Sequence, residues 1–144
     1  MIKKLALALG LALTAALAPA AASSAADSPV REIRGHGLEA CPDRSLCLYQ
    51  DSDYNGGHDA RIWIVTDSVD RLSPFDANDR ASSVYNHGFL KAELCADAEG
   101  MGDYVRLRNG KKLPGLKHVS GYSDHQSTYV NLNDAISSVR LWLG

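Results

Sequence analysis

A six-residue pattern that occurs twice constrains this 144-residue chain more than any other feature of its sequence. The pattern is Asn-Asp-x-x-Ser-Ser followed by Val, and it occupies residues 78–83 and 133–138. A turn-rich segment precedes each copy, beginning near Tyr49 in the first case and near Leu94 in the second. The copies begin 55 residues apart, at positions 78 and 133, which fits the length of one four-stranded unit with its turns. The chain is therefore expected to use one module twice.

The first 26 residues have the composition of a secretory signal peptide. Lys3 and Lys4 give a positive start, residues 5–17 are almost entirely apolar, and small residues follow up to Ala26. The apolar run is shorter than the about 20 residues that a membrane-spanning helix needs. We therefore expect residues 1–26 to be removed, leaving a secreted, extracellular protein without a membrane anchor.

The remaining chain is long enough for one domain with an apolar core. Residues 27–40 are polar and are expected to form a flexible lead-in, whereas residues 41–144 are expected to form the folded domain. Without Lys3 and Lys4 the formal net charge falls from −2 to −4. We do not expect nucleic acid or an anionic membrane as a partner, because both favour a basic face. The domain is expected to be a monomer.

Short apolar segments separated by turn residues predict β-strands. Residues 46–49 are a short apolar run, and residues 61–66 are rich in β-branched and aromatic side chains. Residues 89–94 and 104–108 alternate apolar and polar side chains. Residues 138–143 close the chain with a further strand pattern. No mature segment shows a sustained helical period, so the sequence predicts an all-β sandwich.

All three cysteines lie in the mature part of the chain. In an oxidising compartment Cys41 and Cys47 are expected to form a disulfide that closes a small loop. The alternative is that Cys95 pairs with one of the other two. Cys95 occupies the place in the second unit that Tyr49 holds in the first, which favours a buried, unreactive thiol.

The sequence offers little support for an enzyme. The five histidines show neither His-Glu-x-x-His nor Cys-x-x-Cys spacing, so they are interpreted as scattered surface residues rather than zinc ligands. A nucleophilic Cys95 would need an exposed, activated thiolate, but this residue lies within a predicted strand. We therefore expect a non-enzymatic protein with no catalytic residues.

Basic side chains cluster in the second half of the sequence, near Tyr104 and Tyr122. They are Arg106, Arg108, Lys111, Lys112 and Lys117. On an acidic protein such a cluster is more often a solvated face than a nucleic-acid site. It could equally contact an acidic protein partner.

Several of these segments resemble the βγ-crystallin superfamily. Tyr49-x4-Tyr54-x-Gly56 is similar to the aromatic hairpin signature of its Greek keys, and both Asn-Asp-x-x-Ser-Ser segments are similar to its calcium motif. The resemblance covers residues 46–143 and implies two Greek-key units packed as a sandwich. The Cys-Pro and Leu-Cys-Leu-Tyr segments at the start of the domain further resemble the secreted bacterial crystallin-fold metalloproteinase inhibitors.

The second unit departs from the aromatic hairpin signature. Cys95 and Gly100 stand where the signature has aromatic residues, although Gly102 keeps the last position. We therefore expect the second hairpin to fold more loosely or to pack against another part of the chain.

The resemblance implies that the two motifs act as crossed clamps for up to two calcium ions. The Asp side chain of one motif would reach one ion, while the next carbonyl and the first Ser hydroxyl would reach the other. The ligands would be Asp79, Arg80, Ser82, Asp134, Ala135 and Ser137, and the structural positions Tyr49, Tyr54, Gly56, Ser83 and Ser138. With about one carboxylate per ion, and Arg80 adding a cation beside one site, the expected affinity is modest. Alternatively, these side chains could close turns without metal.

The family resemblance leads to a functional hypothesis. A loop held rigid on the sandwich would inhibit an extracellular metalloproteinase, since rigidity lowers the entropy cost of binding. Residues 110–129, which include the least patterned part of the sequence, residues 111–128, are the candidate loop. The alternative is a calcium-stabilised structural or stress-protective protein with no proteinase target.

Overall fold

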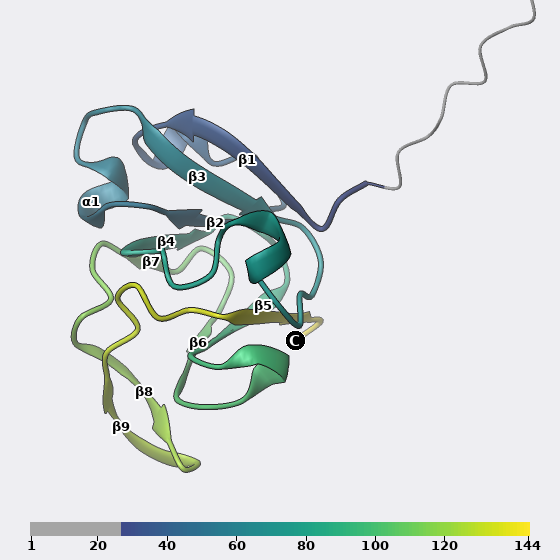
Figure 1. Ribbon diagram of the computed structural model, residues 1–144, viewed down its shortest axis with the longest axis vertical. Coiled ribbons are helices and arrows are strands. Elements are labelled where there is room, and N and C mark those ends of the chain that lie inside the picture. The colour runs from purple at the N-terminus through teal and green to yellow at the C-terminus, as the bar shows by residue number, and fades with distance from the viewer. Residues whose placement is uncertain (1–26) are drawn as a thin grey trace, which may run out of the picture.

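The computed structural model describes residues 27–144, which form two five-stranded antiparallel sheets packed on a shared core (Figure 1). The predicted all-β sandwich is thereby confirmed. Sheet 1 has the order β1 (Val30–Gly35), β3 (Ala60–Val65), β2 (Leu46–Tyr49), β4 (Ser83–Asn86) and β7 (Lys112–Leu113). Sheet 2 has the order β10 (Ser138–Trp142), β5 (Lys91–Cys95), β6 (Tyr104–Leu107), β8 (Val119–Ser123) and β9 (Gln126–Val130).

The two units exchange strand segments, as Greek keys do. Strand β7 belongs to the second unit but pairs with β4 of sheet 1, placing Leu113 opposite Val84. In return, Val69 of the first unit pairs with Val139 of β10, with N–H to carbonyl distances of 2.8 and 2.9 Å. The exchange makes each sheet depend on both halves of the sequence.

The core lies between the sheets because alternate residues of each strand point inward. From sheet 1 it contains Leu48, Trp63 and Val84, and from sheet 2 it contains Leu94 and Val139, all fully buried. Burying each side chain of this size stabilises the fold by about 1.5–3 kcal/mol. The inner faces of both units therefore supply most of the stability that joins them.

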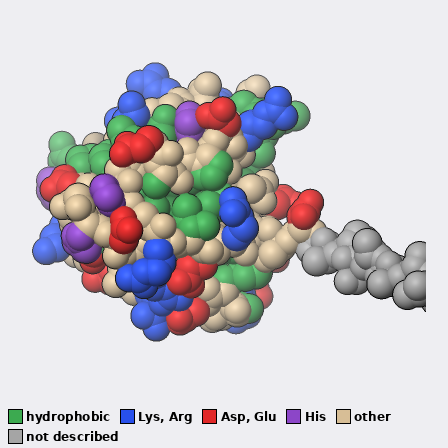
Figure 2. Space-filling view, turned by 90° about the horizontal axis from the view of Figure 1, so that it is seen from above, with side chains coloured by type: hydrophobic (Ala, Val, Ile, Leu, Met, Phe, Trp, Pro, Cys, Tyr) green, Lys and Arg blue, Asp and Glu red, His purple; other side chains and the backbone are tan. Residues whose placement is uncertain are grey.

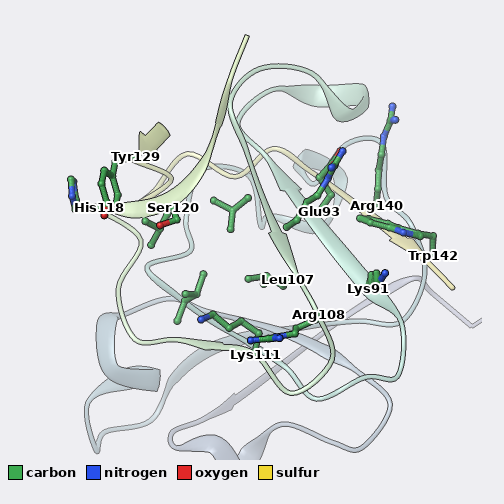
Figure 3. A pocket seen from close by; sticks show the side chains of 14 residues that line it. Lys91, Glu93, Leu107, Arg108, Lys111, His118, Ser120, Tyr129, Arg140 and Trp142 are labelled. Atoms are coloured by element: carbon green, nitrogen blue, oxygen red, sulfur yellow. The ribbon is translucent and has the colours of Figure 1, made fainter. Parts of the chain in front are cut away.

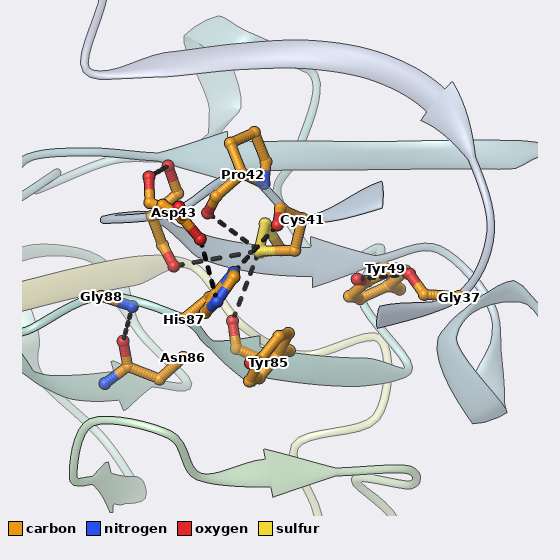
Figure 4. The surroundings of a disulfide bond; sticks show 11 residues. Gly37, Cys41, Pro42, Asp43, Tyr49, Tyr85, Asn86, His87 and Gly88 are labelled. Carbon is orange, nitrogen blue, oxygen red and sulfur yellow. Dashed lines mark hydrogen bonds and ion pairs between the residues drawn. A yellow bond between two sulfur atoms is a disulfide. The ribbon is translucent and has the colours of Figure 1, made fainter. Parts of the chain in front are cut away.

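A second apolar cluster covers the outer face of sheet 1 only. It consists of Cys41, Cys47, Tyr49, Ile62 and Ile64, with Ile33, Ala40, Tyr54 and Tyr85 packed around it. The predicted Cys41–Cys47 disulfide is confirmed and ties the segment that carries η1 (Leu38–Ala40) onto β2 (Figure 4). The Tyr49 hydroxyl adds an anchor by donating to the Gly37 carbonyl at 2.9 Å.

Two expectations from the sequence were wrong in detail. Residues 27–40 are not a flexible lead-in, since Val30–Gly35 form β1 and pair with β3 along their whole length. This strand was not predicted because its outward side chains are charged, so no apolar pattern marks it. It forms because its backbone N–H and carbonyl groups pair with β3, at the edge of sheet 1. Residues 111–128 are also more regular than expected, because they contain β7, β8 and most of β9. The β8–β9 hairpin stands out from the body of the molecule (Figure 1).

Short helical turns complete the fold. Besides η1 they are α1 (Ser52–Asn55), η2 (Ser73–Phe75) and η3 (Ala98–Gly100). Among residues 27–144 no helix has the length and apolarity needed to cross a membrane. The predicted signal peptide, residues 1–26, lies outside the described residues.

Candidate metal centre at the junction of the two units

The two Asn-Asp-x-x-Ser-Ser loops lie against each other where the units meet. The Asp79 N–H donates to the Ile136 carbonyl at 3.0 Å, and the Asp134 N–H donates to the Ala81 carbonyl at 2.8 Å. Asp79 and Asp134 both adopt the left-handed conformation, with φ of 56° and 50°. This conformation is rare for residues other than Gly, Asn and Asp, so the motif uses a residue type that tolerates the turn the loop requires.

The crossed arrangement brings together side chains from different motifs. The Ser137 hydroxyl donates to Asp79 Oδ1 at 3.1 Å, and the Ser82 hydroxyl donates to Asp134 Oδ1 at 3.2 Å. Both serines are nearly buried. Each pair therefore holds a carboxylate and a hydroxyl oxygen within contact distance across the junction.

The backbone carbonyls of Arg80 and Ala135 are free to serve as ligands. Within residues 27–144 neither carbonyl accepts a hydrogen bond. The Arg80 guanidinium contacts the Asp76 carboxylate at 3.0 Å, and this carboxylate compensates part of the positive charge of Arg80. The neighbouring Arg61 and then Arg80 lower the pKa of Asp76, which keeps that compensating carboxylate ionised. The positive charge of Arg80 is therefore less unfavourable to metal binding at this site than the sequence suggested.

A polar hollow of about 310 Å³ opens beside Asp134 and Ser82. It is lined by Gln50, Asp51, Asp79, Arg80, Ser82 and Asp134. Sequence reasoning missed Gln50 and Asp51, which follow β2 directly. Their position directly after Tyr49 could have revealed them. The Tyr49 carbonyl accepts the Ser82 N–H at 2.9 Å, and this bond places the end of β2 beside the first motif.

The donor set fits a hard cation. It consists of carboxylate, hydroxyl and carbonyl oxygens, which calcium prefers, and calcium tolerates the irregular geometry that loops provide. Within the described residues no group of three or more His, Cys, Asp or Glu side chains could hold a metal by itself. A site here would therefore depend on hydroxyl and backbone oxygens as well as on Asp79 and Asp134.

The second serine of each motif fastens a hairpin to its strand. The Ser83 hydroxyl donates to the Asp51 carbonyl at 2.6 Å and accepts the Tyr54 N–H at 3.1 Å. The Ser138 hydroxyl repeats both bonds with the Asp97 carbonyl at 2.6 Å and the Gly100 N–H at 3.0 Å. These bonds make Gly100 the counterpart of Tyr54.

The two hairpins are packed by different side chains. In the first unit the Tyr49 and Tyr54 rings meet edge to face, 5.4 Å apart. In the second unit Arg140 lies over Gly100 and donates to the Glu99 carbonyl at 2.7 Å. The second hairpin is therefore packed against another part of the chain, the second of the two outcomes expected from the sequence.

Cys95, at the end of β5, is fully buried with a free thiol. Burial is the main cause that raises the pKa of this thiol to about 11, and the Glu93 carboxylate adds to it. Such a thiol is protonated at neutral pH and is a poor nucleophile. The structure therefore agrees with the expectation of a buried, unreactive Cys95 thiol.

The double Greek key with crossed motif loops defines a βγ-crystallin-like domain, and solved structures agree. A structure from work on the evolution of the eye-lens βγ-crystallin domain fold is 26% identical, with a TM-score of 0.60, covering 80% of this chain and 98% of that one. Spherulin 3a from Physarum polycephalum is 26% identical, with a TM-score of 0.51 and coverages of 77% and 95%. A βγ-crystallin from Ciona intestinalis is 20% identical, with a TM-score of 0.51 and coverages of 68% and 99%.

Family membership gives the class of protein more narrowly. Residues 36–107 match the model of peptidase inhibitor family I36, and the chain belongs to this family. No curated protein matches the sequence. The chain is thus a crystallin-fold member of a peptidase inhibitor family, and the expectation of a non-enzymatic protein is confirmed.

Proposed function

We propose that the protein is a secreted inhibitor of an extracellular metalloproteinase, with a calcium-stabilised sandwich as its scaffold. The observation that carries the proposal is the match to peptidase inhibitor family I36. The crystallin-like sandwich supports it, because a rigid scaffold lowers the entropy cost of presenting an inhibitory segment.

The β8–β9 hairpin is the proposed contact with the proteinase. Its two-residue tip is Asp124-His125, both exposed and both at positive φ (47° and 63°), as a tight hairpin turn requires. A carboxylate and an imidazole are both zinc ligands, and a catalytic zinc keeps an open position. A metalloproteinase is therefore the class of target that this tip suits best.

An inhibition assay tests the proposal. A thermolysin-type metalloproteinase is expected to lose activity at micromolar protein, whereas a serine proteinase is not. The variant Asp124→Asn/His125→Gly keeps a favoured Asn-Gly turn but removes both zinc-ligating side chains. It is expected to weaken inhibition at least tenfold without changing the melting temperature. Full inhibition by this variant would remove the hairpin tip from the proposal, and no inhibition by the native protein would remove the function.

Calcium is proposed to act as a structural ion. Asp79 and Ser137 with the Ala135 carbonyl would hold one ion, and Asp134 and Ser82 with the Arg80 carbonyl would hold the other. Bound calcium would neutralise carboxylates at the junction and favour the folded state by ordinary linkage. At 100 times the dissociation constant each site would add about 2.7 kcal/mol.

Melting with calcium and with chelator tests this part separately. Calcium is expected to raise the melting temperature, and Asp79→Asn and Asp134→Asn are each expected to reduce the rise. Asp67→Asn, an exposed residue away from the junction, is the matched control. If calcium also stabilises the protein fully in both junction variants, the motif loops do not bind it.

The alternative function is a calcium-stabilised structural or stress-protective protein. The crossed Asp and Ser pairs favour it, since they would serve stability with or without a proteinase target. It predicts the same calcium-dependent melting but no inhibition of any secreted proteinase.

A further inference from the structure

An open groove of about 1090 Å³ lies along the outer side of sheet 2 and takes no part in the proposed calcium sites or the hairpin tip. The core side chains Val105, Leu107 and Val119 belong to its lining, because β6 and β8 pair only at Tyr104 and Tyr122. Side chains from both ends of the sheet define it: Figure 3 shows His118 and Tyr129 at one end, Lys91 and Trp142 at the other, and Arg108 and Lys111 along one side. The basic cluster expected from the sequence is only partly here. Lys112 instead lies over the Tyr85 ring of sheet 1, at 5.4 Å.

The groove is strongly basic on an acidic domain. Its charged lining consists of five cations and one carboxylate, namely Lys91, Arg106, Arg108, Lys111, Arg140 and Glu93. Glu93 is paired with Arg106 at 2.9 Å. Within residues 27–144 no carboxylate lies at ion-pair distance from Lys91, Arg108 or Lys111. Unpaired like charges held together are unfavourable, and a bound anion would relieve them.

The dimensions of the groove suit a single extended chain. From β9 to β10 it crosses five strands, roughly 19 Å at about 4.8 Å per strand. A monomeric small molecule would leave most of the length empty.

The lining also restricts the chemistry of that chain. Lys and Arg donate hydrogen bonds and accept none, so the charged lining favours a ligand that is rich in anionic acceptors. The aromatic rings of Trp142 and Tyr129 offer flat apolar contacts that suit the C–H faces of sugar rings. A single-stranded nucleic acid is rich in acceptors, but domains that bind it are typically basic overall. The ligand is therefore an acidic chain that needs donors and is less densely charged.

We propose that this groove binds an extended acidic polysaccharide. Its carboxylates pair with Lys91, Arg108 and Lys111, and the C–H faces of its sugar rings pack on Trp142 and Tyr129. Stacking of the His118 ring on Tyr129, with centroids 4.1 Å apart, holds that aromatic side chain in place. This inference does not depend on the proposed inhibitor function.

Calorimetric titration with polygalacturonate oligomers tests the proposal. Binding is expected to weaken with added salt and to be lost when the oligomers are fully methyl-esterified, since esterification removes only the charge. Lys91→Ala/Arg108→Ala/Lys111→Ala is expected to weaken binding at least tenfold, because each exposed ion pair can contribute up to about fivefold. The control Arg31→Ala/Lys112→Ala/Lys117→Ala changes the net charge equally, outside the groove, and is expected to bind as the native protein does.

Four results would overturn the proposal. They are no binding of polygalacturonate at millimolar concentration, equal binding of its methyl ester, equal loss in the control variant, and tighter binding of polyglutamate or of oligothymidylate than of polygalacturonate. Because the native protein and both triple variants keep the β8–β9 tip, proteinase inhibition measured on the same samples is expected to be unchanged.

Discussion

Sheet 1 and sheet 2 carry equivalent motif loops and hairpins, but they present their outer faces to different surroundings. On sheet 1 the outward residues Cys47, Tyr49 and Ile62 are buried under the disulfide-tied segment that carries η1. On sheet 2 the outward residues include Glu93 and Arg106, which form an open, charged groove. The inner faces must complement each other, whereas nothing in the sandwich constrains the outer ones. The two units therefore share an equivalent junction but differ in their outer surfaces.

The charge distribution follows the same division. On the sheet 1 side charges of opposite sign are paired, as in the contacts of Arg61 with Glu32 at 2.7 Å and with Asp76 at 2.8 Å. Figure 2 shows acidic, basic and histidine side chains interspersed on the face seen from above. The outer side of sheet 2 instead gathers cations, of which Lys91, Arg108 and Lys111 have no ion pair within residues 27–144. The charges around the buried outer face of sheet 1 are paired with each other, whereas the unpaired cations on the open face of sheet 2 are available to bind a ligand.

The largest expected difference between the units is at the counterparts Tyr49 and Cys95. Tyr49→Ala removes a fully buried ring and the hydroxyl bond to Gly37, and is expected to destabilise the protein by about 3–4 kcal/mol. Cys95→Ala removes one sulfur atom and is expected to cost about 1 kcal/mol. Urea unfolding of both variants measures this. Equal losses would mean that the two outer faces contribute alike.

The disulfide is the next test, because only sheet 1 has a covalently held cover. Cys41→Ala/Cys47→Ala is expected to cost about 2 kcal/mol from the loop entropy of a sequence separation of 6. Amide exchange is expected to rise in β1 and η1 and to stay unchanged in β5 and β6. Uniform acceleration across both sheets would contradict a local role for the cover.

Glycine substitutions compare the two hairpins at a smaller scale. Gly100→Ala is expected to cost about 2 kcal/mol, because its φ is +72° and the new methyl group would collide with Arg140. Gly56→Ala is expected to cost about 1 kcal/mol, since its φ is +53° but its nearest neighbour lies 3.8 Å away. Adding Arg140→Ala to Gly100→Ala should recover part of the loss. No recovery would show that Arg140 does not fill the hairpin.

The smallest expected effect is the pH dependence of the paired rim of sheet 1. A hydrogen bond from Arg61 is the main cause that lowers the pKa of Glu32 below 4.5. The pair therefore stabilises the fold above that value and loses this contribution as pH falls through the lower folded-state pKa. Because the pair is partly exposed, the contribution is below about 1 kcal/mol. Glu32→Gln should lower stability at pH 7 more than at pH 3, whereas Glu39→Gln, which has no ion pair within residues 27–144, should not.

Much of this molecule could be predicted from its sequence because the signals are local. β-Branched and aromatic residues predicted the strand around Trp63, and alternation of apolar and polar residues predicted the strand around Tyr104. The two Asn-Asp-x-x-Ser-Ser segments predicted a repeated unit. The short spacing of Cys41 and Cys47 favoured their disulfide. Each of these signals depends only on backbone periodicity or on side chains a few residues apart.

Other features required the tertiary structure because they depend on residues far apart in the chain. Strand β1 looks polar by itself and becomes a strand only when β3 offers it an edge. Arg140 fills the hairpin at Gly100 from a distance of 40 residues. The basic groove gathers Lys91 and Arg140 with Arg108 across neighbouring strands, an arrangement that strand order alone determines. Local sequence specifies which elements form, whereas long-range packing decides which side chains meet.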